Sequence, residues 1–172
     1  MDDFTIKTDV PNLFGLIQGQ ANAIAPGKRP LSSMAPMLIT RNGQAYLALG
    51  SPGGSRIITI VLQIALNMID YGMQPQEAVD APRIQNQWLP DTVFAEPFAV
   101  SPDTVKLLQG MGYTVTEQTP WGVAEVVARD VGGDGAAIAS SGNDSTFGGN
   151  MRPGLVYGAN DDRGPAGLAV GE

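Results

Sequence analysis

An Asn-Gly pair inside an alternating apolar stretch is the feature that most constrains the fold of this chain. Residues 34–49 read MAPMLITRNGQAYLAL, and apolar side chains alternate with other residues on both sides of Asn42-Gly43. Asn-Gly in such a stretch is a strong signal for a two-residue hairpin turn, because both positions need a positive φ. The sequence therefore predicts two antiparallel strands joined by a turn at Arg41 to Gln44.

A glycine-rich loop and a helix-length apolar run follow the hairpin. Residues 50–54 read GSPGG, and after them Ser55 can cap a helix that runs to about Tyr71 and ends at Gly72. Polar residues recur within this helix at spacings of four, four and three, at Thr59, Gln63, Asn67 and Asp70. We therefore expect one narrow polar stripe on this helix and burial of its remaining surface.

Shorter elements complete the predicted fold. A proline opens a helix over 75–79 that stops before Pro82, and another helix begins at Ser101-Pro102-Asp103, with the serine as its cap, and ends near 110–112. Three further strands are predicted over residues 113–117, 123–129 and 155–157. Strands and helices in alternation, with one clear antiparallel hairpin, indicate a mixed α/β (α+β) fold class.

The length of the chain suits one domain with one core, and we expect a single domain over residues 1–172 because no linker divides it. Residues 131–154 are crowded with Gly, Ser, Asn and Asp, which predicts a flexible insertion. The longest apolar run, 57–69, is interrupted by polar residues and is shorter than the roughly 18 residues of a membrane span. Residues 1–4, MDDF, do not have the pattern of a signal peptide.

The absence of histidine and cysteine limits the chemistry that is open to the chain. It removes Ser-His-Asp and Cys-His catalysis, disulfides, and the usual ligands of zinc, haem and iron–sulfur sites. Hydrolytic chemistry would then use a hydroxyl activated by an amine, or paired carboxylates, and we expect no metal or organic cofactor. A net charge of −7 with only 10 basic residues argues against nucleic-acid binding.

The adjacent glycines Gly53 and Gly54 lie at the predicted strand-to-helix turn. Pro-Gly-Gly is common in turns, so one interpretation is a plain tight connection. The run lacks the Lys-Ser/Thr ending of a phosphate loop and the glycine spacing of a dinucleotide site. The other interpretation is an oxyanion hole, in which two successive N–H groups near a helix start point at one oxygen and stabilise its developing charge.

Three further places each allow a structural and a functional interpretation. Ser32 and Ser33 are either solvated loop hydroxyls or a clamp that donates to both oxygens of a small acid, and a third possibility makes Lys28 a base for Ser32. Asp3 is either a frayed acidic end or the partner of a substrate ammonium. Asn160-Asp161-Asp162 suggests calcium, but the alternating acids and the glutamate of a calcium loop are absent.

Six short motifs together resemble the γ-glutamyltranspeptidase family of N-terminal-nucleophile hydrolases. They are MDDF at 1–4, GKRPLSSM at 27–34, GSPGGSRII at 50–58, IDYGM at 69–73, APR at 81–83 and QWLPD at 87–91. The similarity covers about residues 1–128 and resumes with YGANDDRGPAGLA at 157–169. The resemblance implies the αββα sandwich of that family, incomplete in this chain. Because bacterial members are commonly exported, it also implies a periplasmic or extracellular location.

The resemblance further implies roles for five residues. Asp3 matches the family residue that pairs with the α-ammonium of a glutamyl group, and Ser32 and Ser33 match the pair that binds its α-carboxylate. Gly53 and Gly54 match the oxyanion-hole amides. The implied reaction is γ-glutamyl transfer from donors such as glutathione to water or to an amino acid.

The family nucleophile is a threonine that begins the mature small subunit, upstream of the MDDF motif, and no residue here matches it. We therefore expect this chain to be the C-terminal part of a small subunit and to be inactive alone. Its expected partners are the upstream threonine-bearing segment and the large subunit of the same precursor. Two alternatives stay open: a non-catalytic domain that binds γ-glutamyl compounds or amino acids, and a related glutaryl acylase.

Overall fold

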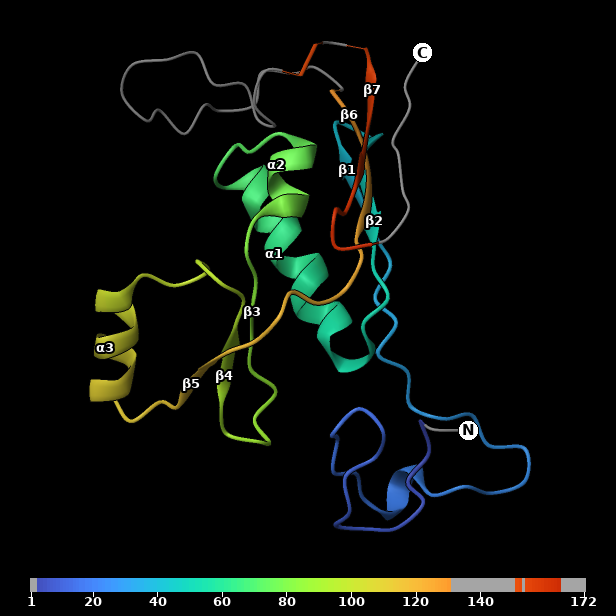
Figure 1. The fold of residues 1–172 in the computed structure, drawn as a ribbon. Helices are drawn as coiled ribbons and strands as arrows, with labels where there is room; N and C mark the ends of the chain where they lie inside the picture. Colours follow the sequence, from blue (N-terminus) through green and yellow to red (C-terminus); the bar gives the residue numbers. More distant parts are fainter. Residues whose placement is uncertain (1–2, 131–150, 153, 165–172) are drawn as a thin grey trace.

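The computed structural model of the protein describes residues 3–130, 151–152 and 154–164 (Figure 1). Its strands are β1 (Met37–Arg41), β2 (Gln44–Gly50), β3 (Ile84–Gln85), β4 (Val93–Ala95), β5 (Val115–Glu117), β6 (Glu125–Arg129) and β7 (Val156–Asn160). Its helices are α1 (Ile57–Ile69), α2 (Pro75–Asp80) and α3 (Pro102–Gly110), with short 3-10 turns at η1 (Gln20–Asn22) and η2 (Gly54–Arg56). Most of the predicted 131–154 insertion lies outside the described residues.

Two sheets lie on either side of α1 (Figure 1). The larger sheet has the order β1-β2-β6-β7, and each neighbouring pair is antiparallel. In the smaller sheet, of order β3-β4-β5, the first pair is antiparallel and the second is parallel. The predicted mixed α+β class is confirmed, and none of the described helices is long and apolar enough to cross a bilayer.

The Asn-Gly hairpin forms as predicted. Arg41 pairs with Gln44 across the turn, and Asn42 and Gly43 have φ values of 53° and 73°. Positive φ at both central residues matches the right-handed twist of the flanking strands. The hairpin makes β2 an inner strand of the larger sheet, because β6 pairs with its other edge.

The core lies between the larger sheet and the helices α1 and α2. Alternate residues of the inner strands are buried, namely Leu47, Leu49, Val126 and Ala128. The facing residues of α1 are Ile60, Val61, Ile64 and Met68. Full burial of an apolar side chain of this size contributes about 1.5–3 kcal/mol, so these contacts hold the start of α1 firmly against β2.

The start of α1 differs from the prediction. Ser55 does not cap the helix, because it lies inside η2 and its hydroxyl donates to Oε1 of Gln87 at 2.7 Å. The α-helix begins later, at Ile57. Its end agrees with the prediction, since Gly72 follows it with a φ of 65°. A tertiary contact of the serine has therefore replaced the local cap.

The surface of α1 also differs from the prediction. The exposed stripe is apolar, at Ile58, Leu62 and Leu66, so the surface outside the polar stripe is not all buried. The polar stripe faces β3, where the side chain of Gln63 accepts from the N–H of Ile84 at 3.0 Å and donates to its carbonyl at 2.9 Å. Gln63 thus satisfies backbone groups of this strand of only two residues.

The remaining elements follow the sequence closely. α2 begins at Pro75 and α3 at Pro102, as predicted. Ser101 precedes α3, but its hydroxyl bonds to Oγ1 of Thr104 at 2.9 Å and caps no backbone N–H. Strands β5, β6 and β7 overlap the three predicted strands, and β7 extends to Asn160.

An irregular N-terminal segment, residues 3–31, lies beyond the η2 end of α1 (Figure 1, blue). Thr5 anchors it internally: its N–H donates to the Asn22 carbonyl at 3.0 Å and its hydroxyl donates to the Gly19 carbonyl at 3.1 Å. Phe4 and Thr5 are both buried. The segment therefore has a small ordered centre of its own, close to the bend that leads into α1.

Candidate active site

The adjacent glycines lie where β2 is followed by the first turn of α1. Gly53 has a φ of 148° and Gly54 a φ of 59°, conformations that glycine adopts readily and other residues rarely adopt. No hydrogen bond among the described residues uses the N–H of Gly53 or of Gly54 as its donor. Two successive amides thus lack an acceptor within the described ranges, at the start of a helix, where the helix dipole is positive.

The N-terminal segment reaches this bend through Phe14. A Cβ atom on Gly54 would lie 2.4 Å from Cδ1 of Phe14, so the ring lies directly against the glycine. Asn12 shapes the loop that carries the ring, because its Oδ1 accepts from the N–H groups of Phe14 and Leu16 at 3.0 and 2.9 Å. Glycine at position 54 therefore leaves the space that this contact needs.

Asn22 joins the Asp3 part of the segment to the part that precedes Ser32. Its Nδ2 donates to the Asp3 carbonyl at 2.6 Å, and its Oδ1 accepts from the N–H of Leu31 at 2.9 Å. The Asn22 side chain therefore joins the backbone of Asp3 to the backbone just before Ser32. Within the described residues, the Asp3 carboxylate has no hydrogen-bond donor and no ion-pair partner.

The two serines lie in an extended stretch after Leu31. Ser32 is exposed, and its hydroxyl accepts from the N–H of Met34 at 3.2 Å. Ser33 is half-buried, and no described residue forms a hydrogen bond with its hydroxyl. Lys28 does not act on Ser32 in this structure, since its ammonium donates to the Ala23 carbonyl at 2.9 Å. The interpretation of Lys28 as a base for Ser32 therefore gains no support.

The glycine pair and the glutamyl-binding candidates are linked indirectly. Among the described residues, no hydrogen bond joins Gly53 or Gly54 to Asp3, Ser32 or Ser33. The connection runs through the N-terminal segment, which touches Gly54 with its Phe14 ring. An open hollow of about 530 Å³ lies in that segment, lined by Gln18, Gly19, Ala21, Asn22, Arg29, Pro30 and Leu31.

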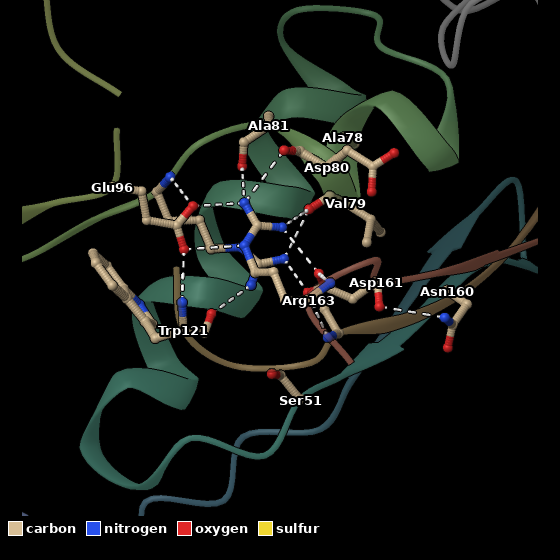
Figure 2. A network of polar contacts seen from close by, with 12 residues as sticks. Ser51, Ala78, Val79, Asp80, Ala81, Glu96, Trp121, Asn160, Asp161 and Arg163 are labelled. Carbon is tan, nitrogen blue, oxygen red and sulfur yellow. Dashed lines mark hydrogen bonds and ion pairs between the residues drawn. The ribbon is translucent and has the colours of Figure 1, made fainter. Parts of the chain in front are cut away.

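A buried network of charged side chains joins Glu96, the end of α2 and the residues after β7 (Figure 2). Arg163 donates to Glu96 through Nη2 at 2.6 Å and Nε at 3.1 Å, and to Asp161 through Nη1 at 3.0 Å. It also donates to the carbonyls of Val79 and Asp80 at the end of α2 and of Ala81 just after it. Helix C-termini carry partial negative charge, so this guanidinium satisfies orphan carbonyls and stabilises the helix end.

Asp161 accepts from both arginines of the network. Arg83 donates to its Oδ2 at 2.6 Å, and Arg163 to its Oδ1 at 3.0 Å. Burial raises the pKa of Asp161, but hydrogen bonds from the N–H of Ala124 and from the two arginines together outweigh this effect and hold the pKa below its usual value. The acid that had suggested calcium is thus engaged in ion pairs.

The network lies against the loop that leads to the glycine pair. The Arg83 guanidinium donates to the Trp121 carbonyl at 2.9 Å. A Cβ atom on the next residue, Gly122, would lie 3.3 Å from Oγ of Ser51 and 3.4 Å from Nη1 of Arg83. The backbone at Gly122 therefore lies close both to Ser51, two residues before Gly53, and to Arg83 of the network.

Several of these residues could not be identified from the sequence pattern. Phe14 and Asn22 lie in an irregular segment where no periodicity marks them. Arg83 belongs to the APR motif, which the resemblance includes without giving it a role. Its partner Asp161 lies 78 residues away in the chain, and no local signal connects the two.

Comparisons with known proteins agree on one family. A family model described as Gamma-glutamyltranspeptidase matches residues 1–151. The glutathione hydrolase proenzyme of Pseudomonas sp. (strain A14) is 50% identical over 99% of this chain and 28% of its own length. That of Escherichia coli (strain K12) is 49% identical over 82% of this chain and 24% of its own length. The chain thus spans about a quarter of the length of these relatives.

Solved structures give the same result. A mutant of Helicobacter pylori gamma-glutamyltranspeptidase is 41% identical with a TM-score of 0.79, and the match covers 95% of this chain and 78% of the other. The Pseudomonas nitroreducens gamma-glutamyltranspeptidase complexed with L-DON is 34% identical with a TM-score of 0.76, covering 99% and 79%. These similarities confirm the predicted fold class, that of the N-terminal-nucleophile hydrolases.

Proposed function

The chain belongs to the gamma-glutamyltranspeptidase family, an enzyme family, and on that premise we propose that it binds the γ-glutamyl group and stabilises the oxyanion in an acyl transfer. The donors would be γ-glutamyl compounds such as glutathione, and the acceptors water or an amino acid. The nucleophile would be a threonine in polypeptide outside these 172 residues, activated by its own α-amine. The large subunit would complete the site.

The amides of Gly53 and Gly54, which bond to no acceptor in the part of the chain that the structure describes, are the observation that supports this proposal best. In the proposed reaction the threonine hydroxyl forms a bond to the γ-carbonyl carbon and passes its proton to the α-amine. Negative charge then develops on the carbonyl oxygen, and two preorganised N–H donors stabilise it without reorganisation. The C–N bond breaks, the leaving amine takes the proton, and water or an amino acid later releases the glutamyl group from the ester.

The glutamyl head carries an ammonium and a carboxylate at the same carbon atom. Asp3 would pair with the ammonium, and its carboxylate has no competing partner among the described residues. Ser32 and Ser33 would donate to the carboxylate oxygens. These three groups and the glycine amides would hold the two ends of one γ-glutamyl chain, so that binding the head positions the carbonyl.

A glutaryl acylase is one alternative, and an acylase is among the solved structures to which the chain is similar. A cephalosporin acylase from Bacillus halodurans is 31% identical over 63% of this chain, with a TM-score of 0.57. A glutaryl group has the same length and a terminal carboxylate but no α-ammonium, so it gives Asp3 nothing to pair with. A non-catalytic domain that binds γ-glutamyl compounds or amino acids is the remaining candidate.

Two anilide substrates separate these functions in the whole protein that contains these 172 residues. We expect hydrolysis of γ-glutamyl-p-nitroanilide to be faster than that of glutaryl-p-nitroanilide. Asp3→Asn should lower kcat/KM for the γ-glutamyl substrate by about tenfold to a hundredfold, because a hydrogen bond to a charged group contributes about 1.5–3 kcal/mol. The glutaryl rate should change much less.

Other results would select another function. Equal rates on both anilides in the unmutated protein would favour the acylase. Binding of glutamate in calorimetry without any turnover would favour the non-catalytic domain. An Asp3→Asn variant with unchanged γ-glutamyl kinetics would remove Asp3 from the site.

A further inference from the structure

We propose that Asn22 is a positioning residue that fixes the spacing between the ammonium partner and the carboxylate partners of the glutamyl head. This inference rests on the proposed function, and it adds a residue that makes the site selective for a group carrying both charges. Asn22 would not touch the substrate. It would act through the backbone on which Asp3 and Ser32 are carried.

The side chain of Asn22 contacts both the Asp3 part of the segment and the part that precedes Ser32. Its Nδ2 donates to the Asp3 carbonyl at 2.6 Å and also to Oε1 of Gln18. Its Oδ1 accepts from the N–H of Leu31 at 2.9 Å, and the next residue in the chain is Ser32. One planar amide therefore connects the backbone of the acid to the backbone before the serines, so its rigid geometry sets their separation.

The backbone frame around Asn22 does not depend on its side chain. The N–H of Thr5 donates to the Asn22 carbonyl at 3.0 Å, and the N–H of Asn22 donates to the Gly19 carbonyl at 3.1 Å. Thr5 also forms a parallel bridge with Ala23. These main-chain bonds keep the Asp3 part of the segment beside residues 19–23. They do not reach Leu31, and the side chain of Asn22 adds that link.

The two substrates depend differently on the distance between Asp3 and the serines, and this difference gives the selectivity. A γ-glutamyl group must reach Asp3 and the serines at once, so a shift of either partner weakens its binding. A glutaryl group uses only the serines and tolerates a displaced Asp3. Because misplacement by about 1 Å can cost about a hundredfold in rate, loss of the Asn22 link should be felt mainly by the γ-glutamyl substrate.

The test compares kcat/KM on γ-glutamyl- and glutaryl-p-nitroanilide in the whole protein that contains these residues. Asn22→Asp is nearly isosteric and keeps the acceptor for Leu31, but it loses both donated hydrogen bonds and sets a carboxylate oxygen against the Asp3 carbonyl. We expect the γ-glutamyl to glutaryl ratio to fall at least about tenfold. Asn22→Ala, which removes both halves of the link, should lower the ratio at least as far and serves if the first variant does not fold.

Asn12→Ala is the matched control. Asn12 also organises the N-terminal segment: its Oδ1 accepts from the backbone N–H groups of Phe14 and Leu16, whereas the Asn22 amide bonds to the backbone of Asp3 and Leu31. Its replacement should change both rates by a similar factor and leave the ratio unchanged. If Asn22 had only a structural role, its replacement would also change both rates by a similar factor and leave the ratio unchanged.

Each outcome has one meaning. If the unmutated protein prefers the γ-glutamyl anilide and folded Asn22 variants keep that preference within about twofold, the inference about Asn22 is overturned while the proposed function stands. If the unmutated protein shows no preference or no turnover, the proposed function has failed and this inference falls with it. Loss of the preference in Asn22→Asp but not in Asn12→Ala supports the inference.

Discussion

At Gly54 a single added methyl group would meet two obstacles. The φ of 59° is a left-handed conformation that costs an alanine about 1–2 kcal/mol, and the new Cβ would lie 2.4 Å from the Phe14 ring. We therefore expect Gly54→Ala to lower the free energy of unfolding of the purified protein by more than the backbone effect alone. Thermal unfolding followed by circular dichroism measures the difference.

Gly27→Ala separates the two effects. Gly27 has a φ of 72°, similar to that of Gly54, but a Cβ atom there would meet nothing within 4 Å. Its replacement should report the backbone cost only. Adding Phe14→Ala to the Gly54 variant should recover the excess loss. Equal destabilisation by the two glycine replacements would show that the Phe14 ring does not press on the bend.

At the residue scale, the glycine pair lies between β2 and α1 as predicted, whereas the roles of the candidate site residues stay predictions. Gly53 and Gly54 stand out in the sequence because two residues without side chains lie together at a predicted strand-to-helix turn. Among the described residues, no acceptor bonds to either amide at that turn. The Phe14 ring could not be anticipated, since its contact with Gly54 joins residues 40 positions apart through an irregular segment.

Among the elements, β3 depends on a side chain of α1. Gln63 accepts from the N–H of Ile84 and donates to its carbonyl, at 3.0 and 2.9 Å. Gln63→Leu would leave both backbone groups of Ile84 without this partner. An unsatisfied polar group costs about 1–3 kcal/mol, so we expect a loss of this size in the free energy of unfolding, measured with urea.

The neighbouring position provides the control. Leu62→Gln places an amide on the exposed stripe of α1, where Leu62 is 48% exposed. This change should alter stability by no more than about 0.5 kcal/mol, as surface substitutions usually do. If Gln63→Leu were equally harmless, water would be satisfying Ile84 and the glutamine would not support β3.

The types of the helices and strands were predictable because their signals are local. Which face of a helix is buried or exposed was not predictable in this way. The hairpin, the proline-initiated helices and the three later strands all lie where turn residues and apolar patterns place them. The start and the exposed face of α1 were mispredicted because tertiary contacts decide both: the loop after β3 binds the hydroxyl of Ser55, and β3 covers the polar stripe, so that an apolar stripe is exposed. The side chain of Gln87 accepts a hydrogen bond from the hydroxyl of Ser55, and the N–H of Ile84 donates one to the side chain of Gln63. Neither partner can be predicted from the spacing of residues along the helix.

For the whole molecule, the buried network joins parts that are far apart in the chain. Asp161 and Arg163 follow β7 of the larger sheet, and Glu96 follows β4 of the smaller one. Glu96 also accepts from the N–H groups of Arg83 and Trp121, at 3.1 and 3.0 Å. The motifs of the resemblance contain some of these residues, but only the fold brings two acids and two arginines together as a neutral group.

Arg163 is the residue through which this network can be tested. Its guanidinium is largely buried and bonds to Glu96, to Asp161 and to the end of α2, so Arg163→Leu leaves Glu96 without its ion-pair partner and Asp161 with Arg83 alone. Breaking a buried pair from one side costs about 3–5 kcal/mol, and we expect a loss of that size in urea unfolding. Hydrogen exchange should accelerate at β4 and at the end of α2.

Two further variants show whether the effect belongs to the network. Arg152→Leu removes an arginine that is exposed and just before β7, and it should change stability by no more than about 0.5 kcal/mol. Glu96→Gln combined with Arg163→Leu should be less destabilising than the sum of the two single changes, because the double variant no longer leaves a buried carboxylate at position 96 unpaired. Strict additivity would mean that Arg163 and Glu96 contribute independently, and the two sheets would then be held together by apolar contacts rather than by this ion pair.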